Sequence, residues 1–114
     1  MNFIDLFSGA GGLSEGFIRA GFNPVAHVEI DKAACNTLIT RTAYHHLKKS
    51  KNLQPYIDYI QNKISRVELY SLIPKNKKES VINMTIGDKN NQIIFDKIDS
   101  LKGEKPIDLI IGGP

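Results

Sequence analysis

Blocks of apolar residues separated by polar turns predict an ordered series of strands and helices. Residues 2–7 form a largely apolar run that stops at a cluster of glycines, and residues 24–30 form a second run. Between them, apolar residues spaced for one face of a helix extend from about Leu13 to Ala20. Gly21 then supplies the left-handed conformation that commonly follows a helix. This pattern predicts a βαβ unit with two parallel strands and a right-handed crossover.

The middle of the chain predicts helices. A helix capped by Asp31 should run to about Leu47, because apolar residues continue at helical spacing over this stretch. Residues 44–86 are expected to form a helical elaboration between the second and third strands. Within it, a Ser-x-x-Glu capping box at residues 65–68 predicts the start of one short helix, and Pro74 should end that helix. The pattern assigns no chemistry to this segment.

The last third of the chain is expected to return to the sheet. Residues 81–84 fit either a short strand or a short helix, and residues 93–101 fit a helix or a strand followed by a helix. Residues 107–111 predict a buried strand. Strands that alternate with helices place residues 1–114 in the α/β class as one domain, with an incomplete doubly wound sheet.

Composition indicates an ordinary globular protein with a modest core. The chain has 114 residues, of which 41% are hydrophobic and 24% charged. It contains no apolar run of the length needed to span a membrane and no secretory signal, so we expect a cytoplasmic protein. Cys35 is the single cysteine, which excludes an intramolecular disulfide, and a buried structural thiol is expected. We find no spacing of residues typical of a metal site.

The net charge of +3 is weak evidence for a nucleic-acid partner. The lysines gather in two polar stretches that we expect to be solvated loops rather than a phosphate-binding patch: Lys48, Lys49 and Lys51, and then Lys75, Lys77 and Lys78.

The glycine cluster after the first strand is the main candidate site. Glycines let a backbone turn sharply and approach a ligand, and the helix that follows directs free N–H groups toward it. A dinucleotide fingerprint would place a third glycine where Ser14 stands. Glu29 follows Gly9 by 20 residues, an offset at which a carboxylate commonly accepts ribose hydroxyls. The alternatives are a ligand-free glycine turn and an acidic residue exposed to water.

Four motifs resemble those of the cytosine-C5 DNA methyltransferases. The first motif of that family is matched by seven consecutive residues, Phe7, Ser8, Gly9, Ala10, Gly11, Gly12 and Leu13. Glu29 and Ile30 resemble its second motif. Gly87 and Asp88 resemble the third, although Lys89 departs from the expected isoleucine. The chain ends in Gly112, Gly113 and Pro114, which resemble the start of the motif that carries the catalytic cysteine.

The resemblance implies a Rossmann-like methyltransferase sheet that binds S-adenosylmethionine. It implies that the residues of the first motif surround the cofactor, with Glu29 on the ribose, Ile30 against the adenine and Asp88 on the adenine amino group. Gly112 and Pro114 would also line the cofactor site. The nucleophilic cysteine is expected just after Pro114, so the chain by itself should be inactive.

The implied reaction is methyl transfer to C5 of cytosine in DNA, in an enzyme of the restriction-modification type. The implied partners are DNA, through the full-length enzyme, and the remaining C-terminal part of the methyltransferase. We also expect self-association through an exposed sheet edge. Two alternatives stay open: a fragment of a nicotinamide- or flavin-dependent oxidoreductase, and a non-catalytic subunit of a split methyltransferase.

Overall fold

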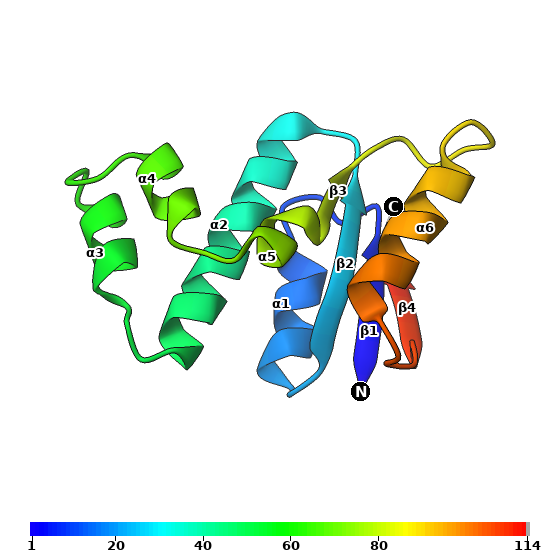
Figure 1. Cartoon of the computed structure of the whole chain (residues 1–114), viewed down its shortest axis with the longest axis horizontal. Coiled ribbons are helices and arrows are strands. Elements are labelled where there is room, and N and C mark those ends of the chain that lie inside the picture. Colours follow the sequence, from blue (N-terminus) through cyan, green and yellow to red (C-terminus); the bar gives the residue numbers. More distant parts are fainter. Residues whose placement is uncertain (114) are drawn as a thin grey trace.

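Four parallel strands form one sheet in the order β3-β2-β1-β4 (Figure 1). The computed structural model describes residues 1–113. The strands are β1 (Asn2–Leu6), β2 (Asn23–Glu29), β3 (Val81–Asn83) and β4 (Leu109–Gly112). The helices are α1 (Gly12–Arg19), α2 (Lys32–Lys49), α3 (Gln54–Ile60), α4 (Arg66–Ser71), α5 (Lys75–Glu79) and α6 (Asn91–Lys102). The α/β class predicted from the sequence is confirmed.

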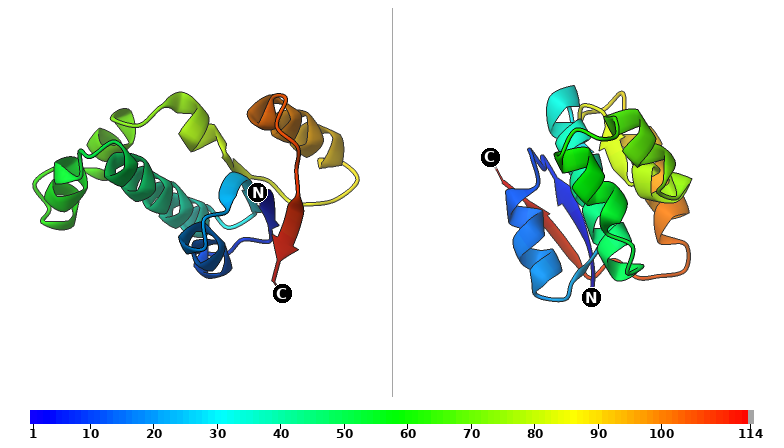
Figure 2. Two further views of the ribbon diagram at one scale, coloured as in Figure 1. Left: turned by 90° about the horizontal axis from the view of Figure 1, so that it is seen from below. Right: turned by 90° about the vertical axis from the view of Figure 1, so that its left-hand side faces the viewer.

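Helices cover both faces of the sheet. The ring of Phe17 on α1 packs against that of Phe3 on β1, with centroids 5.7 Å apart. The next strand residue, Ile4, points to the opposite face because side chains alternate along a strand. There it joins the core formed with α6, which contains Ile4, Ala26, Val28, Ile82, Ile94 and Ile98. Figure 2 shows α1 and α6 on opposite sides of the strands.

The order of the strands creates a topological switch between β1 and β4. From β1 the chain passes through α1 to β2 on one side, whereas it reaches β4 on the other side through α6. In open α/β sheets, ligands bind outside the carboxyl ends of the strands at such a switch point. The fold therefore directs attention to the loops that follow β1, β2, β3 and β4.

Local signals end and begin the helices as expected. The Asp31 carboxylate accepts from the amide of Ala34 at the start of α2. Both hydrogen bonds of the capping box between Ser65 and Glu68 are present at the start of α4. Gly21 follows α1 with a φ of +92°. These predictions are confirmed because each depends on residues a few positions apart.

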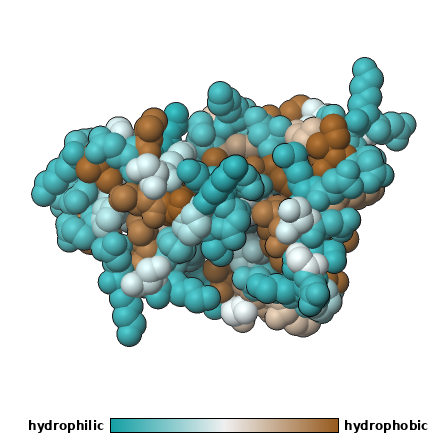
Figure 3. Space-filling view, in the orientation of Figure 1, coloured by the Kyte–Doolittle hydropathy of each residue, from teal (hydrophilic) through white to brown (hydrophobic). Residues whose placement is uncertain are grey.

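The helical segment after α2 has its own small core. Ala43 and Leu47 of α2 pack with Leu69 and Ile73 from the α4 region. In Figure 1, α3 and α4 lie at the side of the molecule away from β4. Figure 3 shows hydrophobic surface on this face near the place where α4 approaches α2. The segment extends the molecule beside the sheet, to a longest dimension of 42 Å.

The bounds of the helical elaboration were predicted wrongly. Residues 81–84 contain β3 rather than a helix, so the helical segment stops before residue 86. The short helix ends as predicted just before Pro74, since α4 ends at Ser71 with Leu72 as its C-cap, and Pro74 also caps the start of α5. Residues 93–101 lie in the single helix α6. A strand as short as β3 leaves little periodic signal in the sequence.

Three further expectations were wrong. The first strand ends at Leu6 rather than at residue 7, because Phe7 has a φ of +56° that a strand cannot accommodate. The lysine groups are mostly helical: Lys48 and Lys49 end α2, and α5 carries the other group. Finally, β4 is an edge strand whose Ile110 is 62% exposed, since among residues 1–113 no strand pairs with its outer side.

Candidate cofactor-binding site

The loop after β1 has a tightly constrained backbone. Gly11 has a φ of +89°, and a Cβ atom there would lie 2.7 Å from Cδ2 of Leu38. The Ser8 hydroxyl donates to the carbonyl of Asp5, and the Ser8 amide donates to the carbonyl of Val28 on β2. These contacts hold the loop against the neighbouring strand. Glycine at position 11 is thus required both by its backbone conformation and by the approach of α2.

The start of α1 presents unused amide groups. Gly11 is the residue before the helix, and among residues 1–113 no side chain caps this helix start. The first N–H groups of a helix have no partner within it, and its dipole places partial positive charge there. Ala10 and Gly12 beside these groups are exposed. The helix start can therefore receive an acceptor group of a ligand.

Glu29 connects the loop to the end of β2. Its Oε1 accepts from the amide of Gly9 at 3.0 Å, and its Oε2 accepts from the amide of Asp31 at 2.6 Å. A carboxylate has about four acceptor positions, so each oxygen keeps capacity for a further donor. Both oxygens could accept from ligand hydroxyls while the loop stays attached.

Three large apolar side chains of the loop, the helix start and the end of β2 are exposed. Phe7 is 59% exposed, Leu13 49% and Ile30 63%. Each follows the carboxyl end of a strand or starts the first helix. The fold therefore brings them to the end of the sheet where the carboxyl termini of the strands lie. Exposed apolar residues gathered beside polar groups are typical of a binding site, because a ligand ring would remove them from water.

The fourth strand ends beside the same loop. Gly112 lies in register with Leu6, and a Cβ atom at Gly112 would stand 2.7 Å from the carbonyl oxygen of Leu6. Two strands at this separation require glycine here. The fold therefore brings Gly112 to the switch point beside the loop, whereas Pro114 lies outside the described residues.

Asp88 lies on the loop that follows the carboxyl end of β3 and is exposed. No hydrogen bond joins its side chain to the rest of residues 1–113. Sequence reasoning missed a neighbour, Asn83, whose side-chain amide donates to the carbonyls of Glu29 and Ile30 at 3.1 and 2.7 Å. Asn83 thereby fixes the turn that carries both residues. Its only signal in the sequence was its position at the end of a short strand.

A buried polar cluster lies next to the loop, on β1, β2 and α1. Asp5 on β1 and His27 on β2 are register partners, and Ser14 of α1 lies within 2.7 Å of Nε2 of His27. Burial raises the pKa of Asp5 to about 6; the nearby hydroxyls of Ser8 and Ser14 oppose this, although neither hydrogen-bonds to the carboxylate. Burial lowers the pKa of His27 to about 4. Ser14 thus replaces the third fingerprint glycine with a hydrogen bond to the sheet.

Cys35 is separate from this chemistry. Its thiol is buried and donates to the carbonyl of Glu29 at 3.3 Å. Burial and the negative charges of Glu29 and Asp31 raise the pKa of the thiol, which keeps it protonated and unreactive. The prediction of a buried structural thiol is confirmed. No group of three metal-binding side chains occurs among residues 1–113, and no helix in that range has the length and apolar character to cross a membrane.

These features define a class of protein. The glycine loop, the helix start, the strand-end carboxylate and the exposed apolar residues lie at the switch point of a doubly wound α/β sheet, where proteins of this class bind ligands. The sequence matches the family of C-5 cytosine-specific DNA methylases over residues 1–110, and the chain belongs to that family.

Two relatives align with the whole chain. It is 35% identical to the type II methyltransferase M.Bpa9945I of Bacillus paralicheniformis, of which it covers 30%. It is 31% identical to the putative type II methyltransferase M.MjaORF1200P of Methanocaldococcus jannaschii, of which it covers 35%. A shorter match, 57% identical over 37 residues, covers 32% of this chain and 10% of the type II methyltransferase M1.HphI of Haemophilus parahaemolyticus.

The chain thus spans about a third of the length of the two relatives that match it throughout. No solved structure matches it.

Proposed function

We propose that this chain binds S-adenosylmethionine and forms the cofactor-binding part of an enzyme that methylates C5 of cytosine in DNA. One observation carries the proposal: the hydrogen bond from the Gly9 amide to Glu29 brings the first two motifs of the family together at the switch point. Membership of the methylase family supports it, and removes support from the oxidoreductase alternative.

The residues at the site suit the chemical parts of this cofactor. Glu29 keeps free acceptor capacity for the two ribose hydroxyls, and the exposed side chains of Phe7, Leu13 and Ile30 suit the adenine ring and the aliphatic part. The unused amides at the start of α1 suit the cofactor carboxylate. We assign Asp88 to the adenine amino group, and Ser8, Gly9, Ala10, Gly11, Gly12, Gly112 and Pro114 to the wall of the site.

When bound, the cofactor supplies an electrophilic methyl group on a sulfonium. The residues of this chain bind and orient it, and the nucleophile must come from elsewhere. Cys35 cannot serve, because it is buried and its raised pKa disfavours the thiolate. We therefore propose that a cysteine following Pro114 is the nucleophile, and that residues 1–114 alone do not methylate DNA.

The names of the relatives support a wider assignment. Because they are type II methyltransferases, we propose that the full enzyme belongs to a restriction-modification system and acts on DNA in the cytoplasm. The remaining two thirds of such an enzyme would supply the nucleophile and the contacts that read the DNA sequence. A split enzyme, in which another chain supplies them, remains compatible with the structure.

Calorimetric titration with S-adenosylhomocysteine tests cofactor binding. We expect saturable binding of S-adenosylhomocysteine and none of NAD at the same concentration. Binding of NAD without a response to S-adenosylhomocysteine would overturn the proposal. Sequencing of the gene beyond the codon for Pro114 tests the second part. A following Pro-Cys pair supports a nucleophile in the same chain, and a stop codon supports a separate partner.

A further inference from the structure

A cavity among residues 1–113 lies away from most of the candidate cofactor residues. It is a groove between α1 and α2 with a volume of about 580 Å³, a size typical of small-molecule sites. We call it the α1–α2 groove. Asn23 and Pro24, at the start of β2, line one end of it. The candidate cofactor residues follow the opposite ends of the strands, and among the described residues Gly11 alone belongs to both sites.

The groove is strongly basic. Its lining contains four basic side chains, Arg41, Lys48, Lys49 and Lys77, against a single carboxylate, that of Glu15. That carboxylate is already engaged: it lies 2.8 Å from Nε2 of His45 and 3.8 Å from the guanidinium of Arg41. Although burial opposes it, the hydrogen bond and charge of His45 lower the pKa of Glu15. The carboxylate stays ionised, yet it offsets only part of the positive charge.

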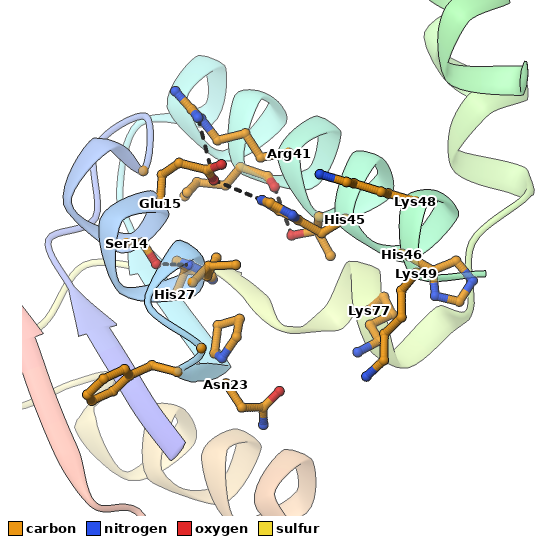
Figure 4. A pocket seen from close by; sticks show the side chains of 17 residues that line it. Ser14, Glu15, Asn23, His27, Arg41, His45, His46, Lys48, Lys49 and Lys77 are labelled. Atoms are coloured by element: carbon orange, nitrogen blue, oxygen red, sulfur yellow. Dashed lines mark hydrogen bonds and ion pairs between the residues drawn. The ribbon is translucent and has the colours of Figure 1, made fainter. Parts of the chain in front are cut away.

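Two of the cations have no partner within residues 1–113. Lys48 lies over the ring of Tyr44, whereas neither Lys49 nor Lys77 forms an ion pair there. Figure 4 shows Lys49 of α2 and Lys77 of α5 extending to the same side of the groove, away from Glu15 and Arg41. Both line the same groove, so an anion bound in it could attract both ammonium groups.

The interior of the groove differs from its rim. Apolar side chains also line it, and they are partly or fully buried: Ile18, Phe22, Pro24 and Leu38. His27 also lines it. This side chain is 4% exposed, its Nε2 lies 2.7 Å from the Ser14 hydroxyl, and its Nδ1 has no hydrogen-bond partner in the described part of the chain. A buried polar atom without a partner costs free energy, so it marks a place where a ligand or water would be favourable.

We propose that the α1–α2 groove binds a small organic phosphate. The phosphate lies between Lys49 and Lys77, where charge-assisted hydrogen bonds to the two ammonium groups hold it. The apolar portion of the ligand lies over Ile18 and Phe22, on the floor formed by β2. The concave shape favours a small molecule over a duplex, whose phosphates lie on a convex surface. This site is separate from the cofactor site of the proposed function.

Nuclear magnetic resonance of the labelled chain tests the proposal with two probes, phenyl phosphate and inorganic phosphate. Neither probe contains adenosine, so neither mimics the proposed cofactor. We expect saturable shifts of amides that line the groove, such as those of Glu15, Thr42 and Lys77. Phenyl phosphate should bind more tightly than inorganic phosphate, since its ring adds apolar contact. Increasing salt should weaken binding.

A matched pair of variants defines the role of the lysines. The double substitution Lys49→Ala and Lys77→Ala should weaken phenyl phosphate binding by roughly tenfold, because it removes both charged donors. The control, Lys51→Ala and Lys78→Ala, removes the same charge from the same region but alters no residue of the groove lining. It should change the affinity by less than about twofold.

Three outcomes would overturn the proposal. The first is an absence of saturable binding of either probe. The second is a set of shifts confined to the loop of residues 7–13, which would place the probe at the cofactor site. The third is a short DNA duplex that binds with the same dependence on Lys49 and Lys77 while phenyl phosphate does not. A failed titration with S-adenosylhomocysteine would leave this site unaffected.

Discussion

Glu29 at the end of β2 accepts a hydrogen bond at 3.0 Å from the amide of Gly9, which precedes it by 20 residues. The other oxygen of this carboxylate accepts a hydrogen bond from the amide of Asp31, the residue before α2. One side chain therefore holds the glycine loop against the second strand and also remains available to a ligand. Several consequences of this arrangement and of its surroundings can be measured.

Replacement of Glu29 should damage both binding and the loop. We expect Glu29→Ala to weaken binding of S-adenosylhomocysteine by at least about tenfold, because two acceptors for ribose and the tether of Gly9 are lost. Calorimetry measures this. Glu104→Ala removes an exposed glutamate on a distant loop and should leave the affinity unchanged. An undiminished affinity of Glu29→Ala would exclude the proposed ribose contact.

Alanine substitutions at Gly11, before α1, and at Gly16, inside α1, should change the stability in opposite directions. Gly11→Ala places a Cβ 2.7 Å from Leu38 at a φ of +89°, so we expect a loss of about 1–3 kcal/mol in the free energy of unfolding. Gly16→Ala adds a methyl group in the interior of α1 with no atom within 4 Å. It should stabilise the chain by about 0.5–1 kcal/mol.

Urea denaturation of both variants measures these changes. Equal effects of the two substitutions would show that the left-handed conformation of Gly11 does not constrain the loop.

Asp5 and His27 should give the stability opposite dependences on pH. His27 has a folded pKa of about 4 against an ordinary value of 6.5, so the unfolded chain binds more protons between them, and this contribution rises with pH over that window. Asp5 has a folded pKa of about 6 against 3.8, so the folded chain binds more protons, and its contribution falls as pH rises from 3.8 to 6. The two largely cancel between pH 4 and 6.

Replacing one of the two residues reveals the pH dependence that the other gives to the stability. Between pH 4.5 and 6, the unfolding free energy of Asp5→Asn should rise relative to that of His27→Gln by roughly 1–3 kcal/mol. The comparison of two variants cancels the contribution of Glu15 and other groups. Parallel pH profiles for the two variants would contradict the burial of either ionisable group.

The thiol of Cys35 should resist modification. Its burial and its raised pKa predict that a disulfide reagent at neutral pH reacts with it much more slowly in the folded chain than in urea. Absorbance of the released thiolate measures the rate. Because Cys35 is the only cysteine, the signal has one source. A rate equal to that of the unfolded chain would show that the thiol is accessible.

The outer side of β4 should promote self-association. This strand is an edge of the sheet, and its Ile110 is 62% exposed. Unpaired strand edges with apolar side chains pair readily with another copy. We expect concentration-dependent sedimentation that Ile110→Lys reduces, while Val67→Lys, at an exposed site on α4, has no such effect. A single monomeric species at high concentration would refute the prediction.

The sequence by itself determined the features that depend on near neighbours. The glycine loop between the first strand and α1, the cap at Asp31 and the capping box at Ser65 are encoded within a few residues, and the structure confirms them. The motifs also pointed to the right family, because they combine several unusual residue types at fixed short spacing.

Only the tertiary structure decided the contacts between distant segments. Three contacts depend on how strands and helices assemble, which the spacing of residues in the sequence does not encode. They are the hydrogen bonds of Asn83, the alignment of Gly112 with Leu6 and the pairing of Ser14 with His27. The short strand β3 and the edge position of β4 follow from sheet pairing in the same way. The α1–α2 groove also needed the fold, because Lys77 reaches it from a helix more than twenty residues beyond α2. Local periodicity sets which elements form, whereas packing sets which side chains meet.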